Sequence, residues 1–179
     1  MIYDCCNTNR KAAVLGNPTL NGLDFLEVLD LEAIPLGLPR QQTLVLHLLK
    51  APAATITTDN ILITGGESIT GITAAWAATP ATLANPLPFT RPVPLTSEAT
   101  AYFTGLQDAA NVLIVGTSEA GDFSTYTLQL VNDASTAPQD TFDLSAALAG
   151  FDPQLTELCF SFKIECGPNF DCQDRKSVV

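Results

Sequence analysis

Strict alternation of apolar and polar side chains is clearest in residues 155–166, whose sequence is LTELCFSFKIEC. One side of an extended chain would carry the apolar residues Leu158, Phe160, Phe162 and Ile164, and the other side Glu157, Ser161, Lys163 and Glu165. Side chains alternate across a β-strand, so this pattern predicts a strand with one face in a core and one in water. Antiparallel sheets tolerate such a wet face, and the stretch therefore favours an antiparallel all-β fold.

Other stretches of the chain extend this prediction. Residues 43–50 and 111–117 are apolar on both faces, which is typical of central, buried strands. Residues 24–30 and 123–131 also favour strands. Residues 60–64 and 68–76 flank Gly65-Gly66, and this arrangement predicts a β-hairpin.

Helical content is expected to be small. Residues 7–15 predict a short helix with Asn7 as its N-cap, ended by Gly16 and Pro18. Five prolines within residues 79–94 exclude a central strand and predict a loop or an edge crossing. Residues 97–107 are ambiguous, and residues 143–149 can form one helical turn.

These patterns predict about seven strands joined by Gly, Pro and Asn turns, after a short N-terminal helix. We expect one domain over residues 1–173, an antiparallel β-sandwich of immunoglobulin or fibronectin type III character.

Composition and charge exclude several classes of partner. The chain has 179 residues, 46% of them hydrophobic and 15% charged, with a net charge of −11. Because phosphate binding needs concentrated positive charge, a nucleic-acid partner is not expected, and neither is an anionic membrane surface. The chain starts without a secretory signal and has no run of 18 apolar residues, so we expect cytoplasmic synthesis and no membrane insertion.

The last six residues, 174–179, have the sequence DRKSVV. A common short-read sequencing adapter, translated in one frame, gives the same six residues followed by a stop. We therefore interpret them as an adapter artefact, and we expect the sequence to be a fragment of a protein that continues beyond Gln173.

Four of the five cysteines lie near the two ends of the chain: Cys5, Cys6, Cys166 and Cys172. If the ends meet, four thiolates could hold a zinc ion or an iron–sulfur cluster. Neither pair has CxxC spacing, and disulfides formed after assembly or ordinary thiols are the alternatives. Cys159 points to the opposite face of its predicted strand from Cys166 and is not expected to take part.

No residue pattern points to catalysis. His47 is the only histidine, and its mid-strand position favours a packed, hydrogen-bonded side chain over a base or a metal ligand. No GxSxG, HExxH or phosphate-loop pattern is present, so we expect no enzyme.

Two weaker hypotheses concern ligand binding. A calcium site could use Glu27, Asp30 and Glu32, although a solvated acidic face explains them better. A sugar-binding platform could use Trp76, Tyr102 and Phe103, although packing explains these aromatic residues better.

Several motifs resemble a known family. They are residues 18–28 (PTLNGLDFLEV), 40–44 (RQQTL), 121–128 (GDFSTYTL), 150–155 (GFDPQL), 160–166 (FSFKIEC) and 169–172 (NFDC). Together with Cys5-Cys6, they resemble the N-terminal region of baseplate assembly proteins of phage-tail-like contractile injection systems. In that family the region precedes a longer part related to the J-like baseplate wedge proteins.

The resemblance implies a structural role. Wedge subunits ring a central hub and couple contraction to the tail tube, so the implied partners are other wedge, hub, sheath or tube proteins. The implied location is cytoplasmic assembly followed by incorporation into a phage-tail-like particle. The alternative function is a stand-alone β-sandwich binding module for carbohydrate or calcium-dependent adhesion.

Overall fold

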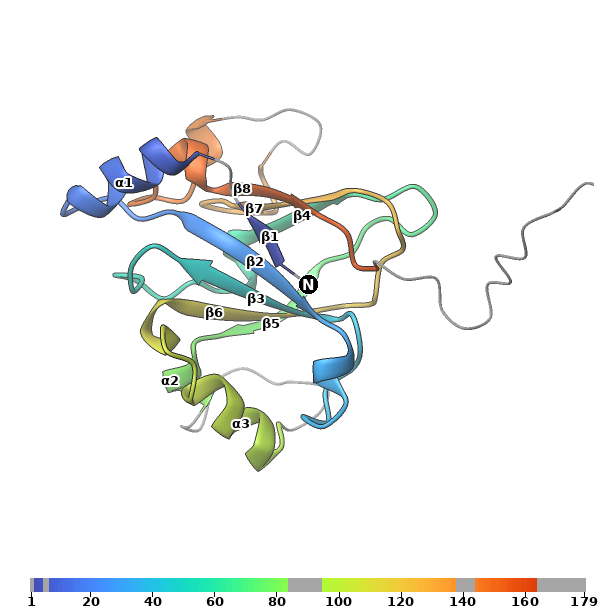
Figure 1. Cartoon of the computed structure of the whole chain (residues 1–179). Helices are drawn as coiled ribbons and strands as arrows, with labels where there is room; N and C mark the ends of the chain where they lie inside the picture. The colour runs from blue at the N-terminus through green and yellow to red at the C-terminus, as the bar shows by residue number, and fades with distance from the viewer. Residues whose placement is uncertain (1, 5–6, 84–94, 138–143, 164–179) are drawn as a thin grey trace, which may run out of the picture.

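The computed structural model describes residues 2–4, 7–83, 95–137 and 144–163, which form two facing antiparallel sheets (Figure 1). The five-stranded sheet has the order β1 (Ile2–Asp4), β2 (Leu23–Leu29), β3 (Thr43–Leu48), β6 (Val112–Thr117) and β5 (Ala74–Ala78). The three-stranded sheet has the order β4 (Ile61–Gly65), β7 (Tyr126–Leu130) and β8 (Glu157–Phe160). The predicted antiparallel β-sandwich is thus confirmed, and its immunoglobulin or fibronectin type III character stays a prediction.

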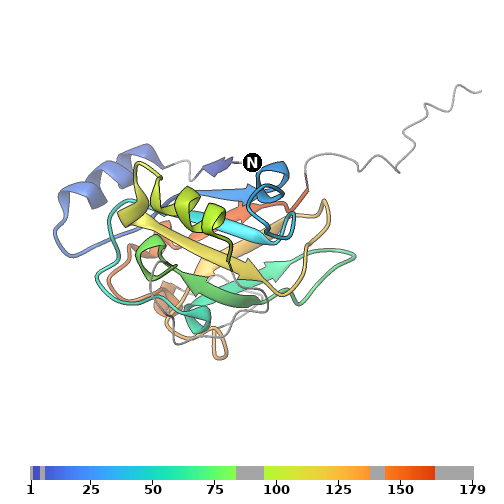
Figure 2. The same cartoon turned by 90° about the horizontal axis from the view of Figure 1, so that it is seen from below.

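Two of the α-helices form a third layer on one side of the five-stranded sheet. The α-helices are α1 (Thr8–Gly16), α2 (Pro80–Leu83) and α3 (Ser97–Thr104). The 3-10 turns are η1 (Leu31–Ala33), η2 (Thr58–Asn60), η3 (Ala109–Asn111), η4 (Leu144–Ala146) and η5 (Pro153–Leu155). Figures 1 and 2 show α2 and α3 on the face that points away from the second sheet, which we call the outer face.

Two separate apolar clusters explain why β3 and β6 are buried along their whole length. The inner cluster lies between the sheets and includes Leu44 and Leu46 of β3 together with Leu128 of β7. The outer cluster lies under α3 and includes Val45 of β3 and Phe103 of α3. Because one face of β3 meets each cluster, the strand carries apolar residues on both faces, and the predicted central position is confirmed.

The predicted N-terminal helix is also confirmed. The side chain of Asn7 accepts a hydrogen bond from the backbone N–H of Arg10 at 3.1 Å, which caps the first turn of α1. The helix ends at Gly16, and Val14 is its only buried residue. Polar contacts must therefore hold α1 to the sandwich.

The predicted hairpin across Gly65-Gly66 is wrong. Here β4 pairs with β7, whereas β5 pairs with β6 in the other sheet. Both glycines have positive φ, 96° and 85°, but they turn the chain over Tyr126, whose hydroxyl donates to the carbonyl of Ile69 at 2.7 Å. The conformation favoured by glycine is therefore used for a crossing between sheets and not for a two-residue turn.

Several boundaries differ from prediction. The last strand, β8, ends at Phe160, although Leu158, Phe160 and Phe162 are buried as their alternation predicted. Ile164 lies outside the described residues. Within the predicted proline-rich loop, residues 80–83 form α2, and residues 84–94 lie outside the described part of the chain.

Candidate assembly surface

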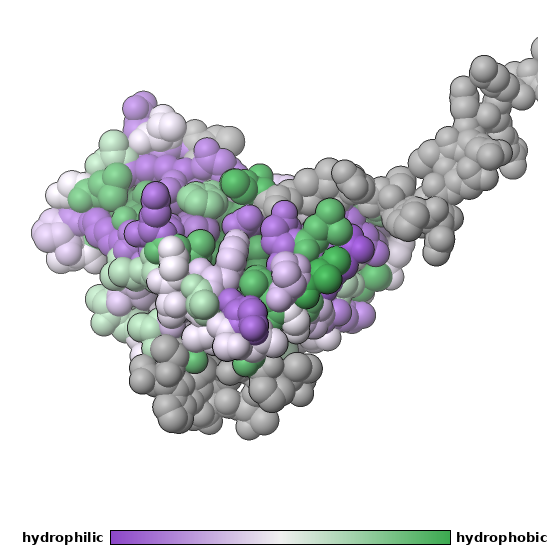
Figure 3. All heavy atoms as spheres, turned by 60° about the horizontal axis from the view of Figure 1, so that its bottom comes forward, coloured by the Kyte–Doolittle hydropathy of each residue, from purple (hydrophilic) through white to green (hydrophobic). Residues whose placement is uncertain are grey.

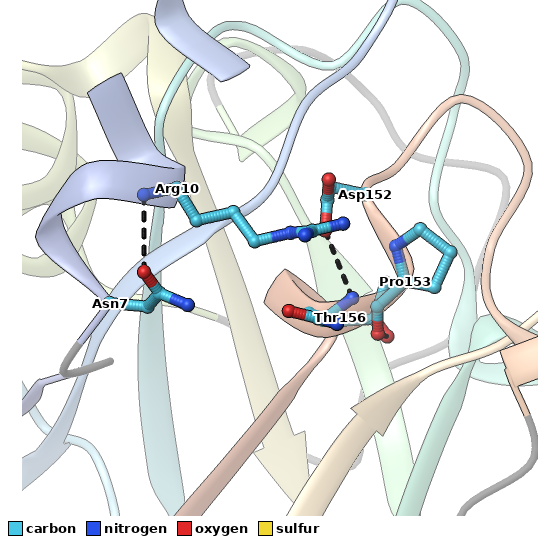
Figure 4. Close-up of polar contacts among 6 residues, drawn as sticks. Asn7, Arg10, Asp152, Pro153 and Thr156 are labelled. Atoms are coloured by element: carbon cyan, nitrogen blue, oxygen red, sulfur yellow. Dashed lines mark hydrogen bonds and ion pairs between the residues drawn. The ribbon is translucent and has the colours of Figure 1, made fainter. Parts of the chain in front are cut away.

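An ion pair anchors α1 to the far end of the described chain. The Arg10 guanidinium Nε lies 2.7 Å from the Asp152 carboxylate, whose side chain is only 7% exposed (Figure 4). The same oxygen accepts the backbone N–H of Gln154 at 3.0 Å and so caps η5. The hydrogen bond with Asp152 raises the pKa of Arg10 above its ordinary value.

A lysine holds the other end of α1. The Lys50 ammonium, just after β3, donates to the carbonyls of Val14 at 2.6 Å, of Leu20 at 2.9 Å and of Asn17. Cations near a helix C-terminus satisfy carbonyls that lack an intrahelical partner. Both ends of α1 are therefore fixed, and its position is set by polar contacts and not by a buried apolar face.

Two of the family-like motifs meet at this junction. The backbone N–H of Asn21 donates to the Gly150 carbonyl at 2.9 Å, and the N–H of Asp152 donates to the Asn21 carbonyl at 2.8 Å. Gly22 approaches Leu155 so closely that a Cβ would lie 2.7 Å from the Leu155 Cβ. The motifs at residues 18–28 and 150–155 thus build one structural junction from distant parts of the sequence.

A carboxylate within the motif at residues 121–128 links two loops. Asp122 accepts hydrogen bonds from the backbone N–H groups of Ser124 at 2.8 Å, Ser68 at 3.1 Å and Ile69 at 3.2 Å, and from the Tyr126 hydroxyl at 3.0 Å. These bonds, led by those with Ser124, hold the pKa of Asp122 well below its ordinary value. The spacing Asp-x-Ser in residues 122–124 is typical of an Asx turn and was the available clue.

His47 is packed, as its position in a strand predicted. Its ring stacks on Phe25 with centroids 3.9 Å apart and an angle of 12°, and its Nδ1 lies 2.5 Å from an Asp108 carboxylate oxygen. The residue is 5% exposed, and within the described residues its buried Nε2 has no hydrogen-bond partner. The pair attaches the segment after α3 to β3.

The cysteines of the proposed metal site, Cys5, Cys6, Cys166 and Cys172, all lie outside the described residues. Cys159 is exposed on β8 as a free thiol, facing away from the core as predicted.

The described residues next to these cysteines do approach one another. The Tyr3 hydroxyl donates to the Ser161 carbonyl at 2.8 Å, and the Tyr3 ring packs edge-on against Phe160. Tyr3, two residues before Cys5, therefore lies next to Phe160 and Ser161, which precede Cys166 in the sequence.

The two ligand-binding hypotheses find little support in the geometry. Asp30 is paired with Arg40, and no three His, Cys, Asp or Glu residues in the described part of the chain are grouped to hold a metal. Trp76 is only 8% exposed and Phe103 is fully buried, as packing predicts, whereas a sugar platform needs an exposed aromatic face.

Two open grooves border the sheets. One, of about 820 Å³, runs along β4 and has Asp59 and Asp133 as its charged residues. The other, of about 610 Å³, lies beside β5 and is lined by Ala, Thr, Pro, Ile56 and Trp76, without a charged residue. No histidine, cysteine or lysine is among the described residues that line either groove.

Negative charge dominates the described surface. Asp and Glu number fourteen and Lys and Arg five among the described residues. Arg10, Lys11, Arg40 and Lys50 all bind oxygen atoms of the chain itself. Most carboxylates are therefore left without a cation, which opposes nucleic-acid binding and favours basic partners.

The helices leave one part of the outer face uncovered. Ile2 of β1 lies opposite Glu27 of β2, and the chain after β2 exposes Leu31, Glu32 and Ile34. We call these five residues the outer-edge patch. Figures 1 and 2 place β1 and η1 at the same end of the molecule, and Figure 3 shows apolar and hydrophilic side chains mixed over this side.

Tyr102 of α3 lies beside the patch. Burial raises the pKa of its hydroxyl above the ordinary value, and the charges of Glu27 and Glu32 raise it further. Both carboxylates are therefore close enough to act on the same hydroxyl.

No helix in the described residues has the length and apolar character needed to cross a membrane.

The fold and its contacts define a class of protein: a β-sandwich domain whose conspicuous polar side chains connect its own elements and leave an acidic surface for partners. Residues 1–160 match the family described as phage baseplate assembly protein, N-terminal domain, and the chain belongs to that family. No curated protein and no solved structure matches the chain.

Proposed function

We propose that this chain is the N-terminal module of a wedge subunit in the baseplate of a phage-tail-like contractile injection system. Its role is structural: it joins neighbouring baseplate proteins and performs no catalysis. The family match over residues 1–160 is the observation that carries the proposal. The wedge position and the contractile system rest on the motif resemblance.

The chemistry of the described side chains supports a structural role. The groups best suited to acid–base work are engaged elsewhere: His47 binds Asp108, Asp122 holds two loops, and Asp152 caps η5 and pairs with Arg10. Each is fixed by packing or hydrogen bonds to the chain itself. Such networks give a rigid scaffold, which suits a protein that must keep its shape within a large assembly.

The proposed partners are the hub, sheath, tube and other wedge proteins of the same particle. Assembly would take place in the cytoplasm of the producing cell, before the particle is complete. In this proposal, residues 1–173 form one domain, and a wedge-like part follows in the natural protein.

A gene deletion tests the proposed function. Cells without the gene are expected to make free tubes or sheaths without intact baseplates, and complementation restores complete particles in electron micrographs. Complete, contractile particles in the deletion strain would refute the proposal. Sequencing across codon 173 tests the wedge assignment separately, because a stop codon there without a wedge-like continuation would contradict it.

A further inference from the structure

We infer that the outer-edge patch docks a segment of another baseplate subunit that carries Arg or Lys flanked by apolar side chains. This inference rests on the proposed function and adds the chemistry of the partner. It is carried by a sheet face that the helices do not cover and by carboxylates on that face that lack a cation.

Exposed apolar side chains in the patch favour binding to a partner. Ile2, Leu31 and Ile34 are 66%, 60% and 58% exposed, and they are the three most exposed large hydrophobic residues of the described chain. Single exposed apolar residues are ordinary, but β1, which carries Ile2, and η1, which carries Leu31 and is followed by Ile34, lie at the same end of the molecule (Figures 1 and 2). A partner that covers them would remove their surface from water.

Glu27 supplies the charge specificity. It is half-buried on β2, between exposed Ile2 on one neighbouring strand and buried Val45 on the other. It makes no ion pair among the described residues, whereas nearby Asp30 is bound by Arg40 with Nη2 at 2.6 Å. A partly desolvated carboxylate without a counter-ion is stabilised by an incoming cation, so a basic side chain of the partner gains most at this position.

Glu32 extends the acidic part of the patch to the η1 turn. Among the described residues its carboxylate accepts one long hydrogen bond, 3.3 Å, from the backbone N–H of Asp30, so it can still receive a cation. Glu27 lies near the end of β2 and Glu32 in the η1 turn that follows, so one short basic segment can reach both.

A second copy of this chain is a poor occupant. Four of the five described cations already bind oxygen atoms of their own chain, and among the described residues only the Lys163 ammonium has no such contact. Two acidic patches would also repel each other. The charges therefore favour a different subunit.

Affinity measurements test the inference. The full chain, tagged at its C-terminus to leave Ile2 accessible, is immobilised and titrated with the purified hub, sheath and tube proteins at low and high salt. Wild type should bind one of them, more weakly at high salt. Glu27→Gln/Glu32→Gln should weaken binding about tenfold or more and reduce the salt dependence.

Two further variants complete the test. Leu31→Ser/Ile34→Ser should weaken binding by a similar factor and keep the salt dependence, because it removes apolar contact only. The matched control Glu67→Gln/Glu157→Gln removes two carboxylates elsewhere and should bind like wild type. Thermal unfolding of each variant verifies that the fold is intact.

The outcomes separate this inference from the proposed function. Tight binding to a baseplate protein with an affinity that neither patch variant changes would overturn the docking site and leave the structural role intact. Self-association of the wild-type chain that both patch variants abolish would overturn the basic partner in favour of a second copy. Failure to bind any of the three proteins, together with normal particles in the deletion strain, would refute both.

Discussion

Gly116 and Trp76 show how one absent side chain shapes the outer layer. The Trp76 indole lies across β6 at Gly116, where a Cβ would come within 2.0 Å of the indole Nε1. Trp76 belongs to the apolar cluster beneath α3, so displacing it disturbs the packing of the whole layer. Glycine is therefore needed at position 116 because it lacks a side chain, and not because of its backbone freedom.

Gly116→Ala should lower the free energy of unfolding by about 1–3 kcal/mol, because an overpacked core must shift its neighbours. Urea denaturation followed by tryptophan fluorescence measures the change. Gly16→Ala is the matched control, since a Cβ added at Gly16 would meet nothing within 4 Å, and it should be neutral or slightly stabilising. Equal midpoints for the two variants would contradict the close contact.

Asp152, which is itself nearly buried, combines a helix cap with an ion pair to the more exposed Arg10. Asp152→Ala should cost about 1–3 kcal/mol of unfolding free energy, because it leaves η5 uncapped and Arg10 without its partner. Thermal or urea denaturation provides the measurement. Asp133→Ala, which removes an exposed carboxylate bonded to Ser135, should cost less. A larger loss at Asp133 would show that the α1 junction contributes little.

Asp122 should govern part of the acid sensitivity of the fold. Its pKa is lowered in the folded state, so its contribution to stability is present above its ordinary pKa near 3.8 and is lost as the pH falls through the lower folded value. Asp122→Asn should therefore flatten the decline in unfolding free energy between about pH 5 and pH 2. Asp59→Asn, on the rim of the groove along β4, is the control and should keep the wild-type profile.

At the scale of elements, α1 depends on contacts from outside the helix. Nine residues form a helix too short to be stable alone, and it buries only Val14. Its position comes from the Arg10–Asp152 pair at one end and from the Lys50 ammonium at the other. The helix should consequently respond to the loss of either contact before the sheets do.

Lys50→Met should loosen α1 without unfolding the sandwich. The variant keeps the apolar stem but leaves the carbonyls of Val14, Asn17 and Leu20 without the ammonium. Hydrogen exchange should become faster at α1 amides and stay unchanged in β3 and β6. Lys163→Met is the control for loss of a lysine and should leave α1 protected. Unchanged exchange in α1 would mean that Lys50 does not hold it.

Local patterns predicted most strands but not their partners. Alternation located β7 and the start of β8, and apolar residues on both faces located β3 and β6, because these patterns depend on which faces are buried. The strand partners of β4 and β5 were not predicted, because Gly65-Gly66 indicates only that the backbone can adopt a positive φ. It does not indicate which sheet the next strand joins. That choice depends on distant groups, among them the Tyr126 hydroxyl at Ile69.

The helical layer and the outer-edge patch were missed for related reasons. In α3, Thr96 caps the helix by accepting from the Ala99 N–H at 3.1 Å, and burial of Phe103 stabilises it, but its eight residues have no strong periodicity. Leu31 and Ile34 look like core residues in the sequence. Only the three-dimensional arrangement shows that no described element covers them.

For the whole molecule, the remaining question is whether its two ends are joined through cysteine. The Tyr3–Ser161 hydrogen bond brings together the segments that lead to Cys5 and Cys166, which supports the proposed zinc or iron–sulfur site. We expect anaerobically purified wild type to contain about one metal site per chain. Cys166→Ser should lose the metal, and Cys159→Ser, which changes the exposed thiol of β8, should keep it. Elemental analysis with a thiol titration decides the matter, because a metal-free wild type would leave only disulfides or free thiols.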